Sequence, residues 1–252
     1  MILAGGFGTR IRDDSDVRPK PLVEIGEKPI IWHIMKNLAN QGITDFIVAL
    51  GYKGEQIKDF FINFNERTSD ITIDTGSGTT TYHRSTMYDD WKVTLVSTGI
   101  ATQTGGRLHL LRAFLGDEPF LCTYGDGLAN LDLTKLIDFH KSHKKTATVT
   151  ATIPKSRFGI LDIDQYGRVT SFSEKAHTIQ RVNGGFFLFE PQIFDYLNES
   201  CTLEKEPLEN LALNAELMAY THDGFWQPMD TMREAEELNS LWNQGLAPWK
   251  NW

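Results

Sequence analysis

The chain has 252 residues, of which 40% are hydrophobic and 23% charged, the composition of an ordinary globular protein rather than a disordered chain or a collagen-like repeat. Its formal net charge of −8 argues against nucleic acid or an anionic membrane as a partner, although a few gathered basic residues can still bind a nucleotide. No apolar run approaches the roughly 18 residues of a membrane helix, and no secretory segment precedes Gly5. Two cysteines cannot form a disulfide framework, so we expect a cytoplasmic protein.

Strand-like and helix-like segments alternate through residues 1–150. Apolar runs predict strands that end near Ala4, Leu50, Tyr124 and Ile153. Helical spacing predicts helices that begin at Pro29 and near Ile57 and Leu133, and Gly42 ends the first of these. Residues 70–100 are rich in Thr and Gly and favour short strands with a hairpin. This alternation is typical of an α/β fold with a mostly parallel sheet between helices.

The second part of the chain, residues 151–252, changes character. Two short runs flank residues 164–167 and predict a β-hairpin. A strand over residues 182–189 carries a glycine kink, and helical segments follow near Phe194, near Leu211 and from Thr231. No linker or internal repeat separates the two parts, so we predict one continuous domain over residues 1–252.

The run Leu3-Ala4-Gly5-Gly6-Phe7-Gly8-Thr9-Arg10 is the sharpest motif. A strand that ends in glycines lets backbone amides approach a phosphate chain or a base. Ile11 stands where the dinucleotide fingerprint requires glycine, and no Gly-Lys-Ser/Thr follows, so neither common phosphate loop fits. The alternative is an ordinary glycine turn.

Four cations follow within eleven residues and form a candidate triphosphate clamp: Arg10, Arg12, Arg18 and Lys20. Pro19 and Pro21 bracket Lys20 and are expected to hold its backbone extended.

A second motif, Tyr124-Gly125-Asp126-Gly127, follows a buried strand. Ligands of open α/β sheets sit beyond the carboxyl ends of strands, so Asp126 should face the same crevice as the first glycine loop. Mg²⁺ prefers one or two carboxylates together with phosphate oxygens, and Asp230 is the candidate partner. The alternatives are an Asp-Gly turn for Asp126 and a helix N-cap for Asp230.

Three further motifs have polar or glycine-rich character. Thr104-Gly105-Gly106-Arg107 precedes an amphipathic segment, which would place backbone amides at a helix N-terminus. Glu174-Lys175 and Asn183-Gly184-Gly185 suit recognition of a polyhydroxylated ligand with a phosphate. A solvated ion pair and a β-bulge are the alternatives for these last two.

In this order, the motifs resemble those of the sugar-1-phosphate nucleotidylyltransferases over essentially the whole chain. The longer runs at residues 28–35, 123–127, 225–231 and 247–250 are similar to the cytidylyl branch of that family. Asn183-Gly184-Gly185 follows that branch, whereas Ala176 replaces the usual proline after Lys175. The family normally has about three more residues before the first strand, so we expect Met1 to be a truncated or misassigned start. Residues 76–90 match nothing.

The resemblance implies a Rossmann-like three-layer α/β/α fold of the nucleotide-diphospho-sugar transferase type, with a mixed, mostly parallel sheet and small β and C-terminal helical elaborations. It implies Mg²⁺-assisted transfer of a cytidylyl group from CTP to α-D-glucose 1-phosphate, giving CDP-glucose and diphosphate. Residues 1–150 would bind the nucleotide and residues 151–252 the sugar. A homo-oligomer, expected to be a hexamer, and a role in deoxysugar and O-antigen synthesis complete the expectation.

The implied site residues fall into four groups. The catalytic group contains Arg10, Lys20 and Asp126, and the metal ligands are Asp126 and Asp230. The nucleotide group contains Leu3, Gly5, Gly6, Gly8, Thr9, Arg10, Lys20, Thr104, Gly105, Arg107 and Gly125. The sugar-phosphate group contains Gly159, Glu174, Lys175, Asn183 and Gly184.

Two other functions remain open from the sequence. A sister enzyme that uses UTP or dTTP would keep every motif and differ only at the base pocket. A non-catalytic nucleotide-sugar-binding regulatory subunit is the other, and the retained set of Arg10, Lys20, Asp126 and Asp230 argues against it.

Overall fold

The computed structural model of the chain describes residues 1–6, 18–83, 90–154, 160–173 and 180–252. In this part, a seven-stranded sheet has the spatial order β14 (Leu217–His222), β10 (Ala147–Thr152), β13 (Val182–Phe189), β8 (Phe120–Tyr124), β1 (Ile2–Ala4), β4 (Asp45–Leu50) and β7 (Lys92–Ser97). Every neighbouring pair is parallel except the two that include β13, which is antiparallel to both β8 and β10. The predicted mixed, mostly parallel sheet is confirmed.

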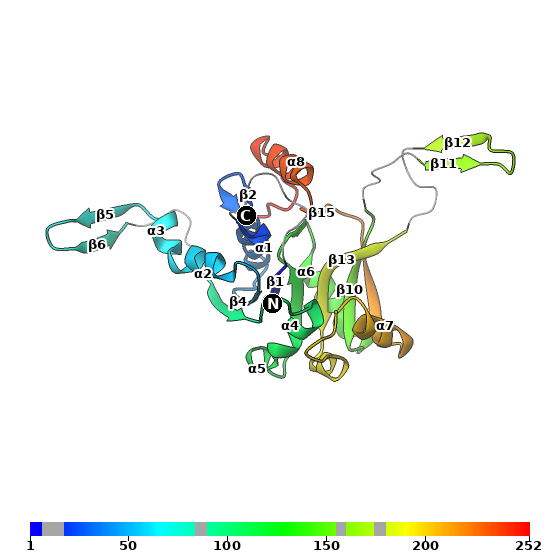
Figure 1. Cartoon of the computed structure of the whole chain (residues 1–252), viewed down its shortest axis with the longest axis horizontal. Coiled ribbons are helices and arrows are strands. Elements are labelled where there is room, and N and C mark those ends of the chain that lie inside the picture. The colour runs from blue at the N-terminus through cyan, green and yellow to red at the C-terminus, as the bar shows by residue number, and fades with distance from the viewer. Residues whose placement is uncertain (7–17, 84–89, 155–159, 174–179) are drawn as a thin grey trace.

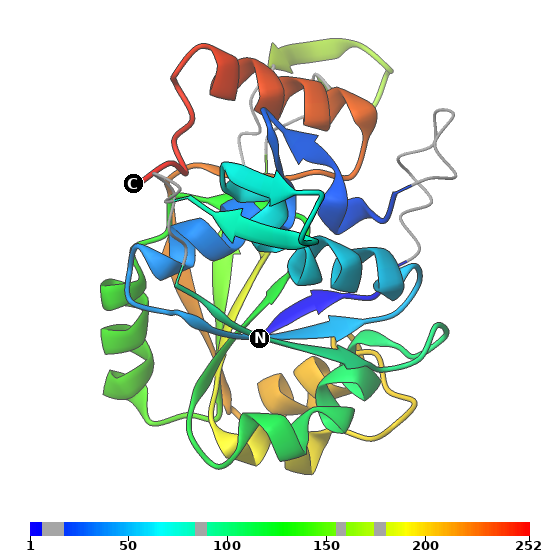
Figure 2. The same ribbon diagram turned by 90° about the vertical axis from the view of Figure 1, so that its left-hand side faces the viewer.

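Helices cover both faces of the sheet (Figure 2). One apolar core gathers side chains from α1 (Ile30–Ala39), α2 (Gly54–Ile62), α3 (Phe64–Thr68), α6 (Leu133–His143) and α8 (Met232–Asn243). The other gathers side chains from α4 (Thr104–Leu110), α5 (Arg112–Leu115), the 3-10 helix η2 (Pro191–Tyr196) and α7 (Glu206–Leu213). Along β1, Ile2 and Ala4 face the first core and Leu3 the second, as the two-residue period of a strand requires. The fold is therefore three-layered.

Small two-stranded sheets lie outside the seven-stranded sheet. They pair β2 (Glu24–Ile25) with β3 (Lys28–Pro29), β5 (Ile71–Asp74) with β6 (Thr79–Tyr82), β9 (Gly127–Ala129) with β15 (Trp226–Pro228), and β11 (Ile160–Ile163) with β12 (Val169–Ser173). The β5–β6 and β11–β12 hairpins, both predicted from the sequence, project from opposite ends of the molecule (Figure 1). Among the described residues, no helix has the length and apolar character needed to cross a membrane.

Two predicted helix starts and types need correction. Pro29 is the N-cap of α1 and not its first helical residue, because it also ends β3 and keeps an extended ψ of 153°. The helix predicted near Phe194 is the 3-10 helix η2. The glycine kink is confirmed as a register shift between β10 and β13, where Gly185 has φ +77°.

Candidate active site

A pocket opens at the carboxyl ends of β1 and β8. These strands are parallel neighbours with Leu3 opposite Tyr124, so the glycines that follow each strand emerge side by side. The pocket holds about 260 Å³ and is lined by Leu3, Gly5, Gly6, Ile100, Ala101, Thr102, Gln103, Thr104, Arg107, Tyr124 and Asp126. Asp126 therefore faces the same crevice as the first glycine loop, as predicted.

Pairing of β9 with β15 brings Asp230 towards Asp126 from 104 positions further along the chain. Pro228 lies opposite Gly127, and the Met229 amide donates to the Asp126 carbonyl oxygen at 2.8 Å. Asp230 is not the N-cap of α8, because Thr231 fills that position in a capping box with Glu234. The Asp230 amide donates to the Glu234 carboxylate at 2.7 Å, which fixes the turn.

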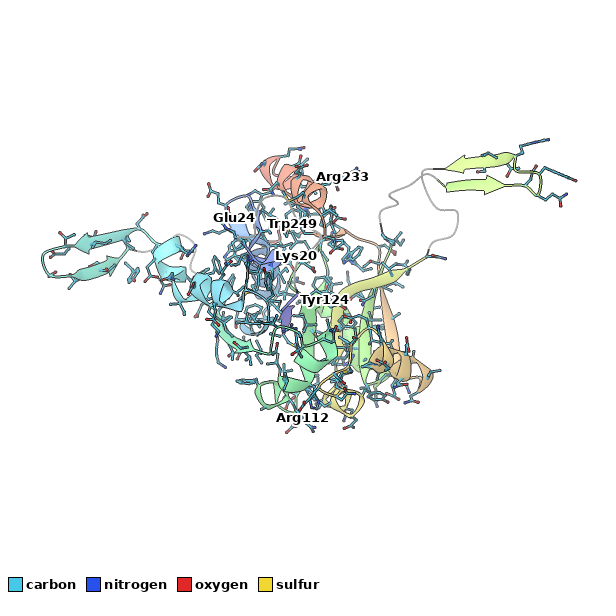
Figure 3. The ribbon with its side chains drawn as sticks, in the orientation of Figure 1. Lys20, Glu24, Arg112, Tyr124, Arg233 and Trp249 are labelled. Carbon is cyan, nitrogen blue, oxygen red and sulfur yellow. The ribbon has the colours of Figure 1, made fainter. Side chains whose placement is uncertain are left out.

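Lys20 lies between the two aspartates (Figure 3 labels Lys20). Its Nζ donates to Oδ2 of Asp126 and, at 2.6 Å, to Oδ1 of Asp230, and only 14% of its side chain is exposed. Burial alone would lower the pKa of Lys20, but the two carboxylates outweigh it and raise the pKa above its usual value. The ammonium is therefore charged at neutral pH.

The backbone around Lys20 differs from the extended conformation that its flanking prolines predict. Lys20 begins the 3-10 helix η1 (Lys20–Leu22), closed by a 2.8 Å bond from the Leu22 amide to the Pro19 carbonyl. Pro21 is accommodated because the first residues of a helical turn need no amide donor. A Cβ on Gly125 would stand 3.3 Å from Pro21, so this glycine lets the turn approach β8 and brings Lys20 to Asp126.

The cluster of Asp126, Asp230 and Lys20 has the donor set of a divalent-cation site. Carboxylate oxygens are hard ligands, and Mg²⁺ characteristically takes one or two of them with the remainder from water and substrate phosphate. Two carboxylates with a single ammonium leave one negative charge for a cation to neutralise. Within the described residues, no group of three or more His, Cys, Asp or Glu side chains could hold a metal on its own. The residues present thus fit a metal shared with a phosphorylated substrate.

Arg107 is buried at the rim of the pocket and is held by neutral oxygens. Its guanidinium donates to the carbonyls of Gly5 (3.1 Å), Leu50 (3.0 Å), Gly99 (2.8 Å) and Ile100 (3.2 Å) and to Oγ1 of Thr98 (2.6 Å). A Cβ on Gly5 would stand 2.2 Å from Arg107 Cζ, and one on Gly51 2.6 Å from its nitrogens. These glycines make room for Arg107, a reason for Gly5 that sequence reasoning did not offer. Burial lowers the pKa of Arg107.

The Thr104-Gly105-Gly106-Arg107 motif lies inside α4 and not before it, since Gln103 is the N-cap. The glycines have a packing role. A Cβ on Gly105 would stand 2.5 Å from Cys201 Sγ, and one on Gly106 2.2 Å from the Glu199 carbonyl. The Gly106 amide donates to the Cys201 carbonyl at 3.0 Å. Two glycines in a helical first turn therefore signal a closely packed neighbouring segment, here residues 199–204.

That segment delivers Glu204, a residue the sequence reasoning missed. Its Oε2 accepts from Oγ1 of Thr104 at 2.6 Å and its Oε1 from the Tyr124 hydroxyl at 2.5 Å. The Asn183 side-chain amide donates to the same Tyr124 oxygen at 3.4 Å. Burial first, and then the charge of Glu204, raise the pKa of Tyr124. Thr104, Glu204, Tyr124 and Asn183 form one chain of contacts, which we call the Glu204 network.

The structure thus brings most of the described candidates to one edge of the sheet. Gly184 lies in β13, where its carbonyl accepts from Trp226 Nε1 at 2.7 Å. Seven candidates lie outside the described residues: Gly8, Thr9, Arg10, Arg12, Gly159, Glu174 and Lys175. Tyr124 belongs to the second motif but had been given no role at the site, and residues 100–103 of the pocket wall had not been singled out. Only the position of Tyr124 at the end of β8, and of residues 100–103 after β7, could have indicated them.

An open α/β sheet with a glycine-lined pocket and a paired-carboxylate site at its carboxyl edge is characteristic of nucleotide-binding enzymes. Residues 1–231 match the family described as nucleotidyl transferase. The chain belongs to this family and is a nucleotidyltransferase. Enzymes of the family generally use a divalent metal.

Comparison with individual proteins is more specific than the family match. The chain is 51% identical over 255 residues to glucose-1-phosphate cytidylyltransferase of Salmonella typhi, covering 100% of this chain and 98% of that protein. It is 43% identical over 254 residues to the probable glucose-1-phosphate cytidylyltransferase of Bacillus subtilis, covering 100% and 99%. Among solved structures, HddC from Yersinia pseudotuberculosis has a TM-score of 0.69 at 24% identity, covering 96% of this chain and 97% of that one, which supports the fold.

Proposed function

We propose that this protein transfers a cytidylyl group from CTP to α-D-glucose 1-phosphate, giving CDP-glucose and diphosphate. The observation that carries the proposal is the convergence of Lys20, Asp126 and Asp230 beside the pocket, in a chain similar over its full length to glucose-1-phosphate cytidylyltransferases.

The chemistry needs no general base from the protein. A phosphate oxygen of glucose 1-phosphate attacks the α-phosphorus of CTP, and the bond from that phosphorus to the bridging oxygen of the β-phosphate breaks. The attacking phosphate is already ionised near neutral pH, since its second pKa is about 6. The protein therefore has to align two anions and offset their charge.

The Lys20 cluster is suited to that task. Asp126 and Asp230 would hold Mg²⁺, which supplies positive charge at the phosphate oxygens when bound. Lys20 carries a full positive charge next to these carboxylates and would contact the α-phosphate or the incoming phosphate. Arg10, by the family resemblance, would cover the leaving diphosphate.

The remaining candidate residues divide between the two substrates. We assign CTP to residues 1–150, with Leu3, Gly5, Gly6 and Thr104 at the pocket wall. Glucose 1-phosphate is assigned to residues 151–252, where Asn183 stands next to Tyr124. By resemblance, Lys175 would contact the sugar phosphate, and Glu174 and Gly159 the sugar hydroxyls.

Base selectivity gives the sharpest test. Cytosine presents an amine donor at position 4 where uracil presents a carbonyl acceptor. A pocket with an acceptor at that edge would leave it unpaired against uracil, at a cost of about 1–3 kcal/mol, so CTP should exceed UTP by roughly 5- to 150-fold in kcat/KM.

The experiment is a diphosphate-release assay with glucose 1-phosphate and each of CTP, UTP, dTTP, ATP and GTP. Equal use of CTP and UTP would retain the sugar nucleotidyltransferase and reject the cytidylyl assignment. If none of the five triphosphates gives diphosphate release although nucleotide binding is measurable, the protein would instead be a regulatory subunit.

We further propose a cytoplasmic homo-oligomer of six copies that supplies CDP-glucose for deoxysugar synthesis. Support comes from the family resemblance and from the projecting β5–β6 hairpin, where Ile71, Ile73 and Tyr82 are exposed. Light scattering coupled to size exclusion measures the mass directly, and a monomer would reject the oligomer.

A further inference from the structure

Glu204 has no role in the activity described so far, yet it connects two parts of the site. It lies in the turn before α7, where the neighbouring Leu203 side chain is fully buried in the second core. The Leu203 amide donates to Oγ1 of Thr104 at 2.9 Å. With the bond from Gly106 to Cys201, this attaches the turn to α4 at two points, so the position of Glu204 is set by backbone packing.

An ionised carboxylate only accepts hydrogen bonds, so its two partners must both donate. The hydroxyl hydrogens of Thr104 and Tyr124 consequently point towards Glu204. A hydroxyl has one hydrogen and two lone pairs. With its hydrogen committed, the Tyr124 oxygen can only accept, and one such bond comes from Asn183.

Tyr124 itself is held in place by its surroundings. Its ring packs edge-on against Phe187, with centroids 6.0 Å apart at 89°. A Cβ on Gly185 would stand 2.5 Å from the Tyr124 ring, so the positive-φ glycine of the β13 bulge makes space for it. The ring lines the pocket two residues before Asp126. The phenolic oxygen therefore has a fixed place at the pocket wall.

We propose that Glu204 is a positioning residue that fixes the Tyr124 hydroxyl as a hydrogen-bond acceptor for a hydroxyl group of a bound substrate. This inference rests on the proposed function and names one more determinant of it. The hydroxyl belongs to the ribose of the nucleotide or to the sugar of glucose 1-phosphate, because the Glu204 network joins Thr104 on one side to Asn183 on the other.

The test compares Glu204→Gln, Tyr124→Phe, the double variant and the control Glu206→Gln, an exposed carboxylate two residues away. A glutamine keeps the size but brings an amide donor and loses the charge, so one hydroxyl is no longer fixed. We expect KM for one substrate to rise about 10-fold. This corresponds to the lower end of the free-energy range for a hydrogen bond to a charged group. The change in kcat and in Tm should be small, and Glu206→Gln should match the wild type.

The double variant decides whether Glu204 acts through Tyr124. If it does, adding Glu204→Gln to Tyr124→Phe causes little further loss. Additive losses would mean that Glu204 contacts the substrate itself and would overturn the proposal. A fall in Tm without a rise in KM, or wild-type kinetics for Glu204→Gln, would also overturn it.

Separate titrations identify the source of the hydroxyl. A rise in KM confined to CTP assigns the ribose, and a rise confined to glucose 1-phosphate assigns the sugar. Calorimetric titration of each variant with CTP alone reports binding without turnover. Wild-type protein that binds CTP but makes no CDP-glucose would reject the proposed function. The inference about Glu204 would still be tested in that case, because weaker ligand binding by Glu204→Gln supports it and unchanged ligand binding contradicts it.

Discussion

Lys20 and Arg107 are both largely buried cations at the same edge of the sheet, and they are held in opposite ways. Lys20 donates to two carboxylates, Asp126 and Asp230. Within the described ranges, the five hydrogen bonds of Arg107 go to neutral oxygens, four of them backbone carbonyls. Opposite charge holds Lys20, so another cation can take over its place. Geometry holds Arg107, which is a fixed part of the pocket wall and places a positive charge there.

The largest effect is expected on the carboxylate side of the Lys20 cluster. Asp126→Asn should keep the fold and lose roughly 10²- to 10³-fold in turnover, because an amide cannot supply the charge that anchors a divalent cation. Steady-state kinetics and a thermal melt measure the two properties. Asp138→Asn, an exposed change on α6, is the matched control. Turnover within a few-fold of wild type would remove Asp126 from the metal site.

The next prediction compares how much Arg107 and Lys20 each contribute to the free energy of unfolding. Arg107→Met removes the five hydrogen bonds that the buried guanidinium makes within the described residues and should cost about 3 kcal/mol of unfolding free energy, although the Leu50 and Gly5 carbonyls keep backbone donors. Lys20→Met removes two ion pairs, both with partly exposed carboxylates, and should cost less than about 1 kcal/mol. Urea unfolding of both variants measures the difference. A larger loss for Lys20→Met would break the comparison.

The elements that carry a local signal were predictable from the sequence. The β4 and β8 strands are short apolar runs, α1 has a helical apolar stripe, and the strand-end rule placed Asp126 in the crevice. The binding partners of the cations were not predictable in this way. Arg107 contacts Gly5 across 102 positions, and Glu204 contacts Thr104 across 100. Such contacts leave no periodicity, and only the glycines that permit close approach hint at them.

Histidine offers a third way to bury a basic group, by giving up its proton. His33 on α1 is fully buried, accepts from Trp249 Nε1 at 3.4 Å and lies 2.8 Å from the Ile25 carbonyl. Burial lowers the pKa of His33 to about 4. Since this folded-state pKa is below the usual 6.5, the unfolded chain binds the proton more tightly, and stability is lost as pH falls from 6.5 towards 4.

The loss attributable to His33 should be about 2–3 kcal/mol between pH 7 and pH 4, at 1.36 kcal/mol per pKa unit. In His33→Gln the stability profile should flatten by that amount over this range, whatever the stability at pH 7. Parallel profiles for wild type and His33→Gln would show that folding does not lower the pKa of His33.

The smallest effect concerns cation exchange at Lys20. In the absence of nucleotide, a divalent cation must displace the ammonium from Asp126 and Asp230. Lys20→Met should therefore bind Mn²⁺ about 10-fold more tightly than wild type, because a competing positive charge is gone. Calorimetry with Mn²⁺ measures this, with the exposed Lys92→Met as control. Unchanged or weaker binding would contradict the exchange.

The place of β1 in the sheet has a consequence for synthesis on the ribosome. Ile2 pairs with Val48 on one side and with Thr123 on the other, so this interior strand is made before both of its neighbours and is completed late. At 5–20 residues per second, roughly 6–24 s separate the translation of Ile2 from that of Thr123. During that interval one edge of β1 has no partner strand, and unpaired edges invite aggregation. Chaperone dependence in the cell should accordingly fall once β8 has left the exit tunnel.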